Sequence, residues 1–335
     1  MFSDVKYNSK SVVVLALSQL KGIGPAFIKK VTGLGVSSSN AYEELRRIIT
    51  ENSKLFEDEI LFRATEYAEE IITKCNDDGI TIISLNNQDY PATLKELRDP
   101  PPVLFCKGNL DLLYSKTVCI IGTREPNQRG IKIAERVGSF FANSNWTICN
   151  GLAAGIDSYS VKIEQSFHRN VIGVMAGGLN YNSQRTLLKN TALNADKVIE
   201  NGGLIVSEIV PDKKEDTFTV VKSCRIQAGL SNGLVLVQSS LDGGSKFTTK
   251  AFCEISRPIG VINPVGEDYH LSSYEANTAI IEGYKKGLSR FTELKEDKII
   301  TSRVFTIKTK DDYAELESLL SKSYGSLHRD NSLFG

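Results

Sequence analysis

Glycine-rich turns follow four short apolar runs of the chain, and one of the turns carries an arginine. The turns are Gly122-Thr123-Arg124, Gly151-Leu152-Ala153-Ala154-Gly155, Ala176-Gly177-Gly178 and Asp242-Gly243-Gly244-Ser245. Glycine lets the backbone approach a ligand closely, N–H groups at a helix start favour an anion, and Arg124 presents a fixed fork of donors that suits phosphate. A single turn of this kind is explained equally well as a short strand-to-helix connection. Four of them together favour a phosphate-bearing ligand.

The common nucleotide-binding and catalytic motifs are missing from these turns. None forms Gly-x-x-x-x-Gly-Lys-Ser/Thr, and no Gly-x-Gly-x-x-Gly follows the first strand, so nucleotide hydrolysis and dinucleotide binding have little support. Asp157 and Glu208 come at predicted strand ends, where a carboxylate either binds a metal or substrate or bonds the N–H groups of its own loop. We favour the second role. His168 and His270 lack a carboxylate at a spacing that would orient a general base.

A sheet is needed to bring the turns together, and the sequence predicts one from residue 80 onward. Short β-rich runs alternate there with amphipathic stretches such as 130–141, which is typical of a parallel sheet with crossover helices. The predicted strands are 81–85, 103–106, 118–121, 147–149, 171–175, 204–207, 234–237 and 259–262. In an open parallel sheet, ligands bind beyond the carboxyl ends of the strands, where the turns would meet. We therefore predict an α/β, Rossmann-like, doubly wound and mostly parallel sheet.

The first 76 residues are predicted to form a small helical domain of SAM or helix-hairpin-helix type. Apolar residues recur there at three-and-four spacing, with charges on the opposite face. Gly22-Ile23-Gly24 is similar to the turn of a helix-hairpin-helix, whose N–H groups contact a DNA phosphate without reading sequence. Lys21, Lys29 and Lys30 lie nearby. A turn that only packs two helices is the favoured interpretation, because one hairpin alone binds weakly.

Length and pattern divide the chain into three parts. At 335 residues, the chain exceeds the size at which a single core grows economically. We expect a helical domain at 1–76, a sheet domain at 77–290 and a C-terminal extension at 291–335, with a strand at 303–307 and a helix at 311–320. The sequence predicts no role for the extension.

Composition limits what the protein does and where it works. Forty basic and forty acidic residues cancel, so contact with nucleic acid has to come from a local patch. The six cysteines are scattered with no Cys-x-x-Cys pair, which predicts buried thiols in a reducing cytosol and no metal site. The sequence lacks a signal-peptide pattern and a run of about eighteen apolar residues, so we expect a cytoplasmic protein that does not span a membrane.

Over roughly residues 10–288, the order of motifs resembles the DprA/Smf family. The resemblance is carried by Gly22-Ile23-Gly24, Asp89-Tyr90-Pro91 with Leu94, Asp99-Pro100-Pro101 through Leu104-Phe105 to Lys107-Gly108-Asn109, Ile121-Gly122-Thr123-Arg124, Gly151-Leu152-Ala153 with Gly155-Ile156-Asp157, Gly202-Gly203 before Ser207-Glu208, Arg225 before Ala228-Gly229-Leu230-Ser231, Gly244-Ser245 with Thr248, and Asn277-Thr278. It implies a homodimeric protein that binds single-stranded DNA and helps load the RecA recombinase during DNA uptake. It also implies that the protein catalyses no reaction and needs no cofactor.

The resemblance also implies which residues contact DNA. They are Gly122, Thr123, Arg124, Gly151, Gly155, Arg225, Gly244, Ser245 and Thr248, and we add Lys222 as a cation beside them. Arginine and backbone N–H groups neutralise phosphates, and glycines let the backbone come close. The family usually carries Phe-Pro-x-Arg-Asn-Arg where this chain has Val220-Val221-Lys222-Ser223-Cys224-Arg225, so one arginine is missing. Lys222, or Phe218 as a stacking face, would compensate, and we expect weaker rather than absent binding.

Two other functions remain open. DprA-like proteins also occur beside toxins in phage-defence modules, where they restrain a partner protein, and the altered segment 220–225 keeps that role as an alternative to DNA uptake. The stretch from Asp242 to Thr248, with Glu254 beyond it, resembles the Pro-Gly-Gly-x-Gly-Thr loop and glutamate of phosphoribohydrolases that activate cytokinins. It lacks the second Gly-Thr step. Nucleotide processing is therefore the least favoured function.

Overall fold

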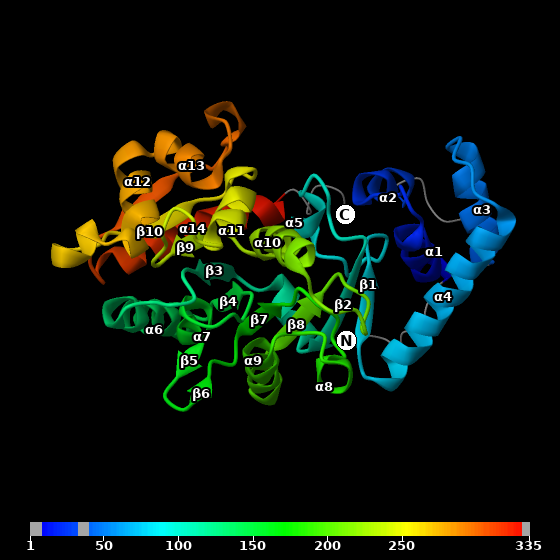
Figure 1. Ribbon diagram of the computed structural model, residues 1–335, viewed down its shortest axis with the longest axis horizontal. Coiled ribbons are helices and arrows are strands. Elements are labelled where there is room, and N and C mark those ends of the chain that lie inside the picture. Colours follow the sequence, from blue (N-terminus) through cyan, green and yellow to red (C-terminus); the bar gives the residue numbers. More distant parts are fainter. Residues whose placement is uncertain (1–8, 33–39, 330–335) are drawn as a thin grey trace. The chain divides into compact units, whose positions relative to one another are not determined.

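The computed structural model describes residues 9–32 and 40–329, and these fall into two units (Figure 1). The helical unit comprises the chain up to Lys107 together with Gly177–Thr186 and Val206–Lys214. The sheet unit comprises Gly108–Ala176, Leu187–Ile205 and the chain from Glu215 onward. This division does not coincide with the predicted boundaries at 76/77 and 290/291. Two later segments of the chain belong to the helical unit, and the C-terminal segment belongs to the sheet unit. Each unit is therefore made of segments that are not consecutive in the sequence.

Four helices begin the helical unit, as the apolar spacing predicts. They are α1 (Ser9–Gln19), α2 (Pro25–Thr32), α3 (Ala41–Glu51) and α4 (Asp58–Asp77). α1 packs against α3 and α4 and buries every side chain from Val12 to Leu17, so it forms the centre of this bundle. The turn after α1 places Gly22 at φ +85°, a conformation that glycine adopts without strain.

The lysine that follows this turn has a packing role. Lys29 Nζ donates to the carbonyl oxygens of Lys95, at 2.6 Å, and Leu97, at 3.1 Å. These carbonyls lie at the end of α5 (Ala92–Lys95), so Lys29 ties α2 to the later part of the same unit. The favoured interpretation of the turn, as a packing turn rather than a DNA-binding hairpin, gains support from this contact.

Two strands and one further short helix complete the helical unit. β1 (Thr81–Ser84) and β2 (Val103–Gly108) pair antiparallel, with Thr81 opposite Cys106. The later helix is α8 (Tyr181–Gln184). The third glycine turn, at Gly177 and Gly178, also belongs to this unit.

The sheet unit is built on a parallel sheet with the strand order β7-β4-β3-β9-β10-β11, and β8 (Leu204–Ser207) comes next to β7. The six strands are β3 (Thr117–Ile121), β4 (Thr147–Asn150), β7 (Val171–Val174), β9 (Leu234–Leu236), β10 (Ile259–Ile262) and β11 (Val304–Ile307). Every pair among them is parallel. The chain builds the sheet outward on one side of β3 and then restarts on its other side with β9, so the strand order reverses at β3. The predicted fold class is confirmed.

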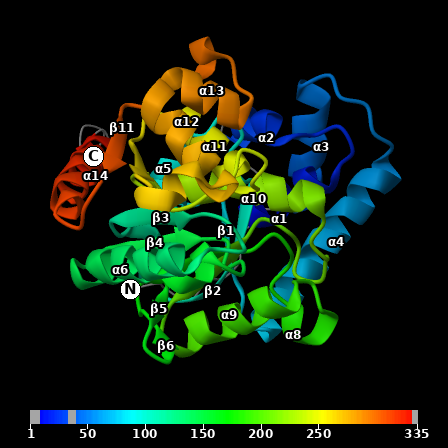
Figure 2. The same ribbon diagram turned by 60° about the vertical axis from the view of Figure 1, so that its left-hand side comes forward.

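Helices cover both faces of this sheet (Figures 1 and 2). One face carries α10 (Thr217–Leu230), α11 (Ser245–Cys253), α12 (Glu275–Gly283) and α13 (Lys285–Thr292). The other carries α6 (Gln128–Asn143) and α9 (Lys189–Glu200), while α7 (Ile156–Ser160) follows β4. A two-residue hairpin, β5 (Lys162–Ile163) with β6 (Ser166–Phe167), lies between α7 and β7. Residue 130, where the predicted helix began, is in α6.

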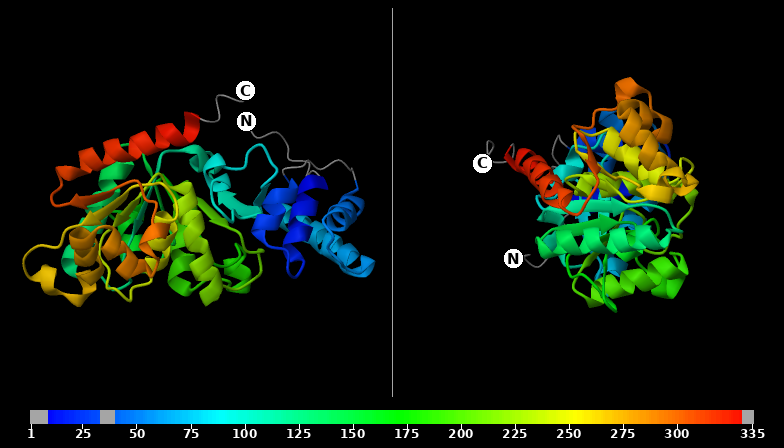
Figure 3. Two further views of the ribbon diagram at one scale, coloured as in Figure 1. Left: turned by 90° about the horizontal axis from the view of Figure 1, so that it is seen from above. Right: turned by 90° about the vertical axis from the view of Figure 1, so that its left-hand side faces the viewer.

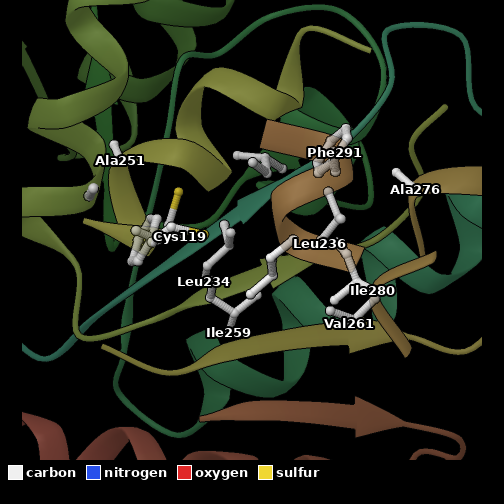
Figure 4. Packing of buried hydrophobic residues seen from close by; sticks show 14 of the residues in the cluster. Cys119, Leu234, Leu236, Ala251, Ile259, Val261, Ala276, Ile280 and Phe291 are labelled. Carbon is white, nitrogen blue, oxygen red and sulfur yellow. The ribbon is translucent and has the colours of Figure 1, made fainter. Parts of the chain in front are cut away.

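A hydrophobic cluster fills the space between the strands and α11 to α13. In Figure 4, Leu236 and Val261 of the strands lie toward Ile280 and Phe291 of the helices. Cys119 and Cys253 belong to this cluster, and all six cysteines are free and buried. Burial raises the pKa of these thiols, for Cys149 to about 12, because the thiolate would lose its hydration. The predicted buried thiols are confirmed.

The C-terminal segment is part of the sheet unit. β11 pairs parallel to β10, with Ile259 opposite Val304, and α14 (Asp312–Arg329) packs on α6 and β11 (Figure 3). Trp146 Nε1 donates to Glu317 Oε1 over 3.1 Å, and the rings of Phe140 and Tyr313 lie 5.4 Å apart. Within the described ranges, no helix combines the length and the apolar character that a bilayer crossing needs.

Candidate nucleic-acid interface

The loop after β3 lies at the point where the strand order reverses, which is the usual ligand position in this fold class. Thr123 N–H donates to Gln238 O over 2.7 Å, which joins the loop to the end of β9. Gly122 has to be glycine, since a Cβ there would lie 2.6 Å from Ile156 Cγ1 and 2.7 Å from Gln238 O. Gly122 and Thr123 therefore serve the internal fit of the loops, and Arg124 is the exposed member of the predicted trio.

The loop after β4 is organised by Asp157. Its Oδ2 accepts hydrogen bonds from Gly151 N–H at 3.1 Å and from Ala153 N–H at 3.4 Å. Leu152 N–H donates to Asn150 Oδ1 at 2.9 Å. In this structure, the amides of Gly151, Leu152 and Ala153 therefore donate to side chains of the protein itself. The structural role favoured for Asp157 is the one observed.

Gly155 locks the same loop onto the loop after β3. Its φ is +83°, and a Cβ there would lie 2.3 Å from Thr123 O and 2.6 Å from the Arg124 Cα. Ile156 N–H donates to Thr123 O over 3.1 Å. The two loops thus form one rigid body, and glycine at 155 is required by that approach. Because the two loops pack against each other, the backbone that carries Arg124 is held in place.

The charge of Arg124 acts on two buried or half-buried carboxyl groups. Burial raises the pKa of Asp157 to about 7, while the amides of Ala153 and Gly151 and the charge of Arg124 oppose that rise. Burial also raises the pKa of Glu215, opposed by the hydrogen bond from Leu188 N–H and again by Arg124. The guanidinium therefore lies within electrostatic reach of both Asp157 in the loop after β4 and Glu215, two residues before α10.

α10 begins with a capping box and presents an exposed aromatic ring. Asp216 Oδ1 accepts from Thr219 N–H at 2.8 Å, and Thr219 Oγ1 accepts from Asp216 N–H at 2.8 Å. Phe218, the second residue of the helix, is 73% exposed. Lys222 and Arg225 follow at spacings of four and three residues, so Phe218, Lys222 and Arg225 lie on one face of α10, which we call the α10 stripe.

The pattern of burial along α10 does not separate apolar from polar residues as in an ordinary amphipathic helix. Ser223 and Gln227 are buried although they are polar, whereas Phe218 stands in solvent. Sequence periodicity alone would miss this helix for that reason. Arg225 Nη1 donates to Lys222 O over 2.8 Å, which keeps the guanidinium beside its own helix.

The predicted residues of α11 divide into an open start and a buried interior. Gly244 is the N-cap, has open space where a Cβ would stand, and gives the first helical amides no side-chain cap. Ser245 and Thr248 are buried, and Ser245 Oγ lies 2.6 Å from Ser239 Oγ. Thr248 hydrogen bonds to Cys224 of α10. The hydroxyls of Ser245 and Thr248 thus join elements of the protein, and Gly244 is the exposed member of these three residues.

A buried arginine that the sequence did not point to secures the end of α10. Arg257 is 1% exposed, and its Nη1 donates to Gly229 O at 2.8 Å, to Ser231 O at 2.6 Å and to Ala228 O. A cation at these last carbonyls matches the negative end of the helix dipole. The Ala228-Gly229-Leu230-Ser231 motif therefore anchors α10 to the sheet unit.

The remaining predicted groups are not gathered into a second site. Glu208 belongs to the helical unit and Asp157 to the sheet unit. His168 is buried, which lowers its pKa by desolvation, and His270 is exposed. Across residues 9–32 and 40–329, no three His, Cys, Asp or Glu side chains come together in the way a metal ion needs.

Comparison with known proteins places the chain in a family. The family described as DNA recombination-mediator protein A matches residues 81–283, which is more than half of the chain. The chain belongs to the DprA/Smf family. The DNA processing protein DprA of Bacillus subtilis is 32% identical over 190 residues, covering 56% of this chain and 62% of that protein. Protein Smf of Synechocystis is 28% identical over 263 residues, covering 75% and 64%. The chain thus spans less than two thirds of the length of these DprA/Smf relatives.

Solved DprA structures share the fold. The X-ray structure of DNA processing protein A from Streptococcus pneumoniae has a TM-score of 0.63 at 22% identity and covers 92% of this chain and 97% of that one. A structure of DNA processing protein A from Helicobacter pylori, reported for its single-stranded DNA binding mode, has a TM-score of 0.50 at 23% identity over 56% of this chain and 83% of that one. At these identities the likeness shows the fold alone.

Proposed function

We propose that the chain binds single-stranded DNA and catalyses no reaction on it, with the contact made by Arg124, the α10 stripe and the start of α11. Family membership supports this proposal, and so does the DNA-binding mode reported for the Helicobacter pylori protein. The observation that carries it is the α10 stripe. An exposed ring beside two cations is the combination that binds a strand by stacking on bases and neutralising phosphates.

The predicted residues take different parts in this proposal. Arg124, Lys222, Arg225 and the Gly244 amide are the proposed contacts, because they are exposed or half-buried on the sheet unit. Gly122, Thr123, Gly151 and Gly155 shape the loops, while Ser245 and Thr248 hold α11 in place. Phe218 replaces a contact of the family that the sequence at 220–225 lacks.

Fluorescence anisotropy with a labelled oligothymidylate and a matched duplex tests the proposal. We expect tighter binding of the single strand at low salt. Phe218→Ala should weaken it by about 1–3 kcal/mol, since one base loses its stacking face. Phe62→Ala is the matched control, because Phe62 is also an exposed helical aromatic, at 51%. No detectable binding by the wild type at low salt, or equal binding by both variants, would reject the proposal.

A protein partner is the second candidate, and the exposed Phe218 supports that as well. An apolar ring in solvent serves a protein interface as readily as a base. RecA, a toxin or a second copy of this chain would then cover α10. Under this proposal Phe218→Ala breaks a protein complex and leaves the anisotropy titration unchanged, so the same variant separates the two.

Phosphoribohydrolase activity gains nothing from the geometry of α11. Glu254, the glutamate it would need, is the C-cap of the helix that Gly244 begins. At 1.5 Å per residue, the two ends of α11 lie about 13 Å apart, so Glu254 does not reach a ligand at the glycine loop.

A further inference from the structure

A hollow of about 330 Å³ opens at the carboxyl ends of β10 and β11 in the sheet unit. Its lining comes from the first turns of α6, from 262–274 and from 307–313. None of the proposed DNA contacts lines it. It therefore calls for an explanation of its own.

The lining is strongly basic in a chain whose total charge is zero. Five cations stand around the hollow, and Asp268 is the one carboxylate of its lining. The cations are Arg129, Lys132, Arg136, Lys308 and Lys310. Those of α6 recur at spacings of three and four, so they share one face of the helix. Lys308 and Lys310 lie in the segment that follows β11. A hollow lined mainly by positive charges and bounded by apolar walls raises the local concentration of anions.

Two of these cations are already positioned by the protein. Arg129 Nη1 donates to Val265 O at 2.7 Å and lies 3.1 Å from Asp268 Oδ2. Arg136 hydrogen bonds to Tyr313. These contacts fix guanidinium groups at the rim without neutralising the other three charges. A held guanidinium gives an anion a bidentate partner at little entropic cost.

Tyr274 gives an independent sign of a ligand. It lines the hollow and is fully buried, yet its hydroxyl has no hydrogen-bond partner in the described part of the chain. Burial and the nearby Asp268 raise the pKa of Tyr274 to about 12, against the charge of Arg129, so it remains an O–H donor. An unpartnered buried donor destabilises a fold unless a ligand or a water completes it.

We infer that this hollow binds a phosphorylated small molecule of mononucleotide size. The volume is at the lower end for ligand pockets, which suits one such molecule rather than a polymer. The cations take the phosphate. The apolar side chains Ile133, Ile262 and Ile307 give its organic part a surface that bare phosphate would leave empty. This site goes beyond DNA binding and stands on different residues.

Isothermal titration calorimetry of the full chain with AMP, GMP and inorganic phosphate tests the inference. We expect a nucleotide to bind more tightly than phosphate, and Lys132→Glu/Lys308→Glu to weaken it by about tenfold or more, because two charge-assisted contacts become repulsive. Lys285→Glu/Lys286→Glu is the control, since both lysines are exposed, lie outside the hollow and change the net charge equally.

Tyr274→Phe distinguishes a binding role from a purely structural one. The change removes only the hydroxyl, so we expect weaker nucleotide binding at an unchanged or higher melting temperature. Unchanged affinity in Tyr274→Phe and in the lysine pair would overturn the inference. So would no nucleotide binding by the wild type, or a loss of oligothymidylate binding alone in the lysine pair, which would make the hollow part of the DNA path. Normal oligothymidylate binding with lost nucleotide binding supports it.

Discussion

Single residues decide how the candidate interface is built, and Asp157 shows this most clearly. A carboxyl group in the middle of a predicted phosphate loop looks unfavourable for DNA binding. The structure instead uses it to bind the loop amides and to stiffen the base on which Arg124 stands. In the proposed DNA site, the groups that attract phosphate are therefore cationic side chains and not the amides of this loop.

Asp157 makes the stability of the protein depend on pH. Its pKa is about 7 when folded and near 3.8 when unfolded, so the folded state binds the extra proton. Between these values the free energy of unfolding falls as pH rises, by up to about 1.4 kcal/mol per unit. We expect Asp157→Asn to flatten this fall. The effect is measured as the difference between the urea midpoints of the wild type and the variant from pH 4 to 7. His168, whose pKa is lowered by burial, makes stability rise with pH, but it does so equally in both proteins and cancels in the difference. Parallel profiles would contradict the assignment.

Arg257 is the residue whose loss we expect to cost most. Arg257→Met keeps the apolar stem but leaves the carbonyls of Ala228, Gly229 and Ser231 without their donor. We expect a loss of about 2–4 kcal/mol in the free energy of unfolding. Urea unfolding followed by the fluorescence of Trp146, the single tryptophan, reports on the sheet unit. Arg303→Met, at an exposed position, should stay within about 0.5 kcal/mol of the wild type.

At the scale of elements, the sequence predicts the strands that are buried apolar runs, and it does not predict α10 or the β5–β6 hairpin. Most strands of the sheet are recognisable because they are short apolar runs that are buried on both faces, as β4, β7, β9 and β10 are. α10 escapes periodicity because Ser223 and Gln227 are buried while Phe218 is exposed. The β5–β6 hairpin has strands of two residues, too short to leave a pattern. The hydrogen bonds from the amides of Gly151 and Ala153 to Asp157 cannot be predicted from the spacing of residues in the sequence.

Docking of α14 is an element-scale prediction. Leu320 is fully buried, and a Cβ at Gly233 would lie 2.2 Å from its Cδ2. Leu320→Ala should lower the free energy of unfolding by about 2–5 kcal/mol, because the cavity is hard to collapse. Guanidinium unfolding monitored at Trp146, which bonds to α14 through Glu317, measures the loss. Leu55→Ala, at a side chain 96% exposed, is the matched control, and an equal effect of both changes would argue against docking.

At the scale of the whole molecule, a net charge of zero sets how DNA binding responds to salt. Without a long-range field, the salt dependence reflects only the phosphates that are contacted directly. We expect Arg124→Ala to reduce the slope of log K against log salt by about 0.7, the value for one phosphate contact on a single strand. Anisotropy titrations at four salt concentrations measure the slope. Arg63→Ala, on the helical unit, should leave it unchanged.

Photo-crosslinking tests most directly whether the strand lies on Arg124 and α10. A bromodeoxyuridine oligonucleotide is bound to the full chain, irradiated and digested with trypsin, and the peptides are identified by mass spectrometry. We expect the label on peptide 215–222, which carries Phe218. Labelling confined to the helical unit, or to the segments that line the hollow at 129–136 and 307–313, would contradict this.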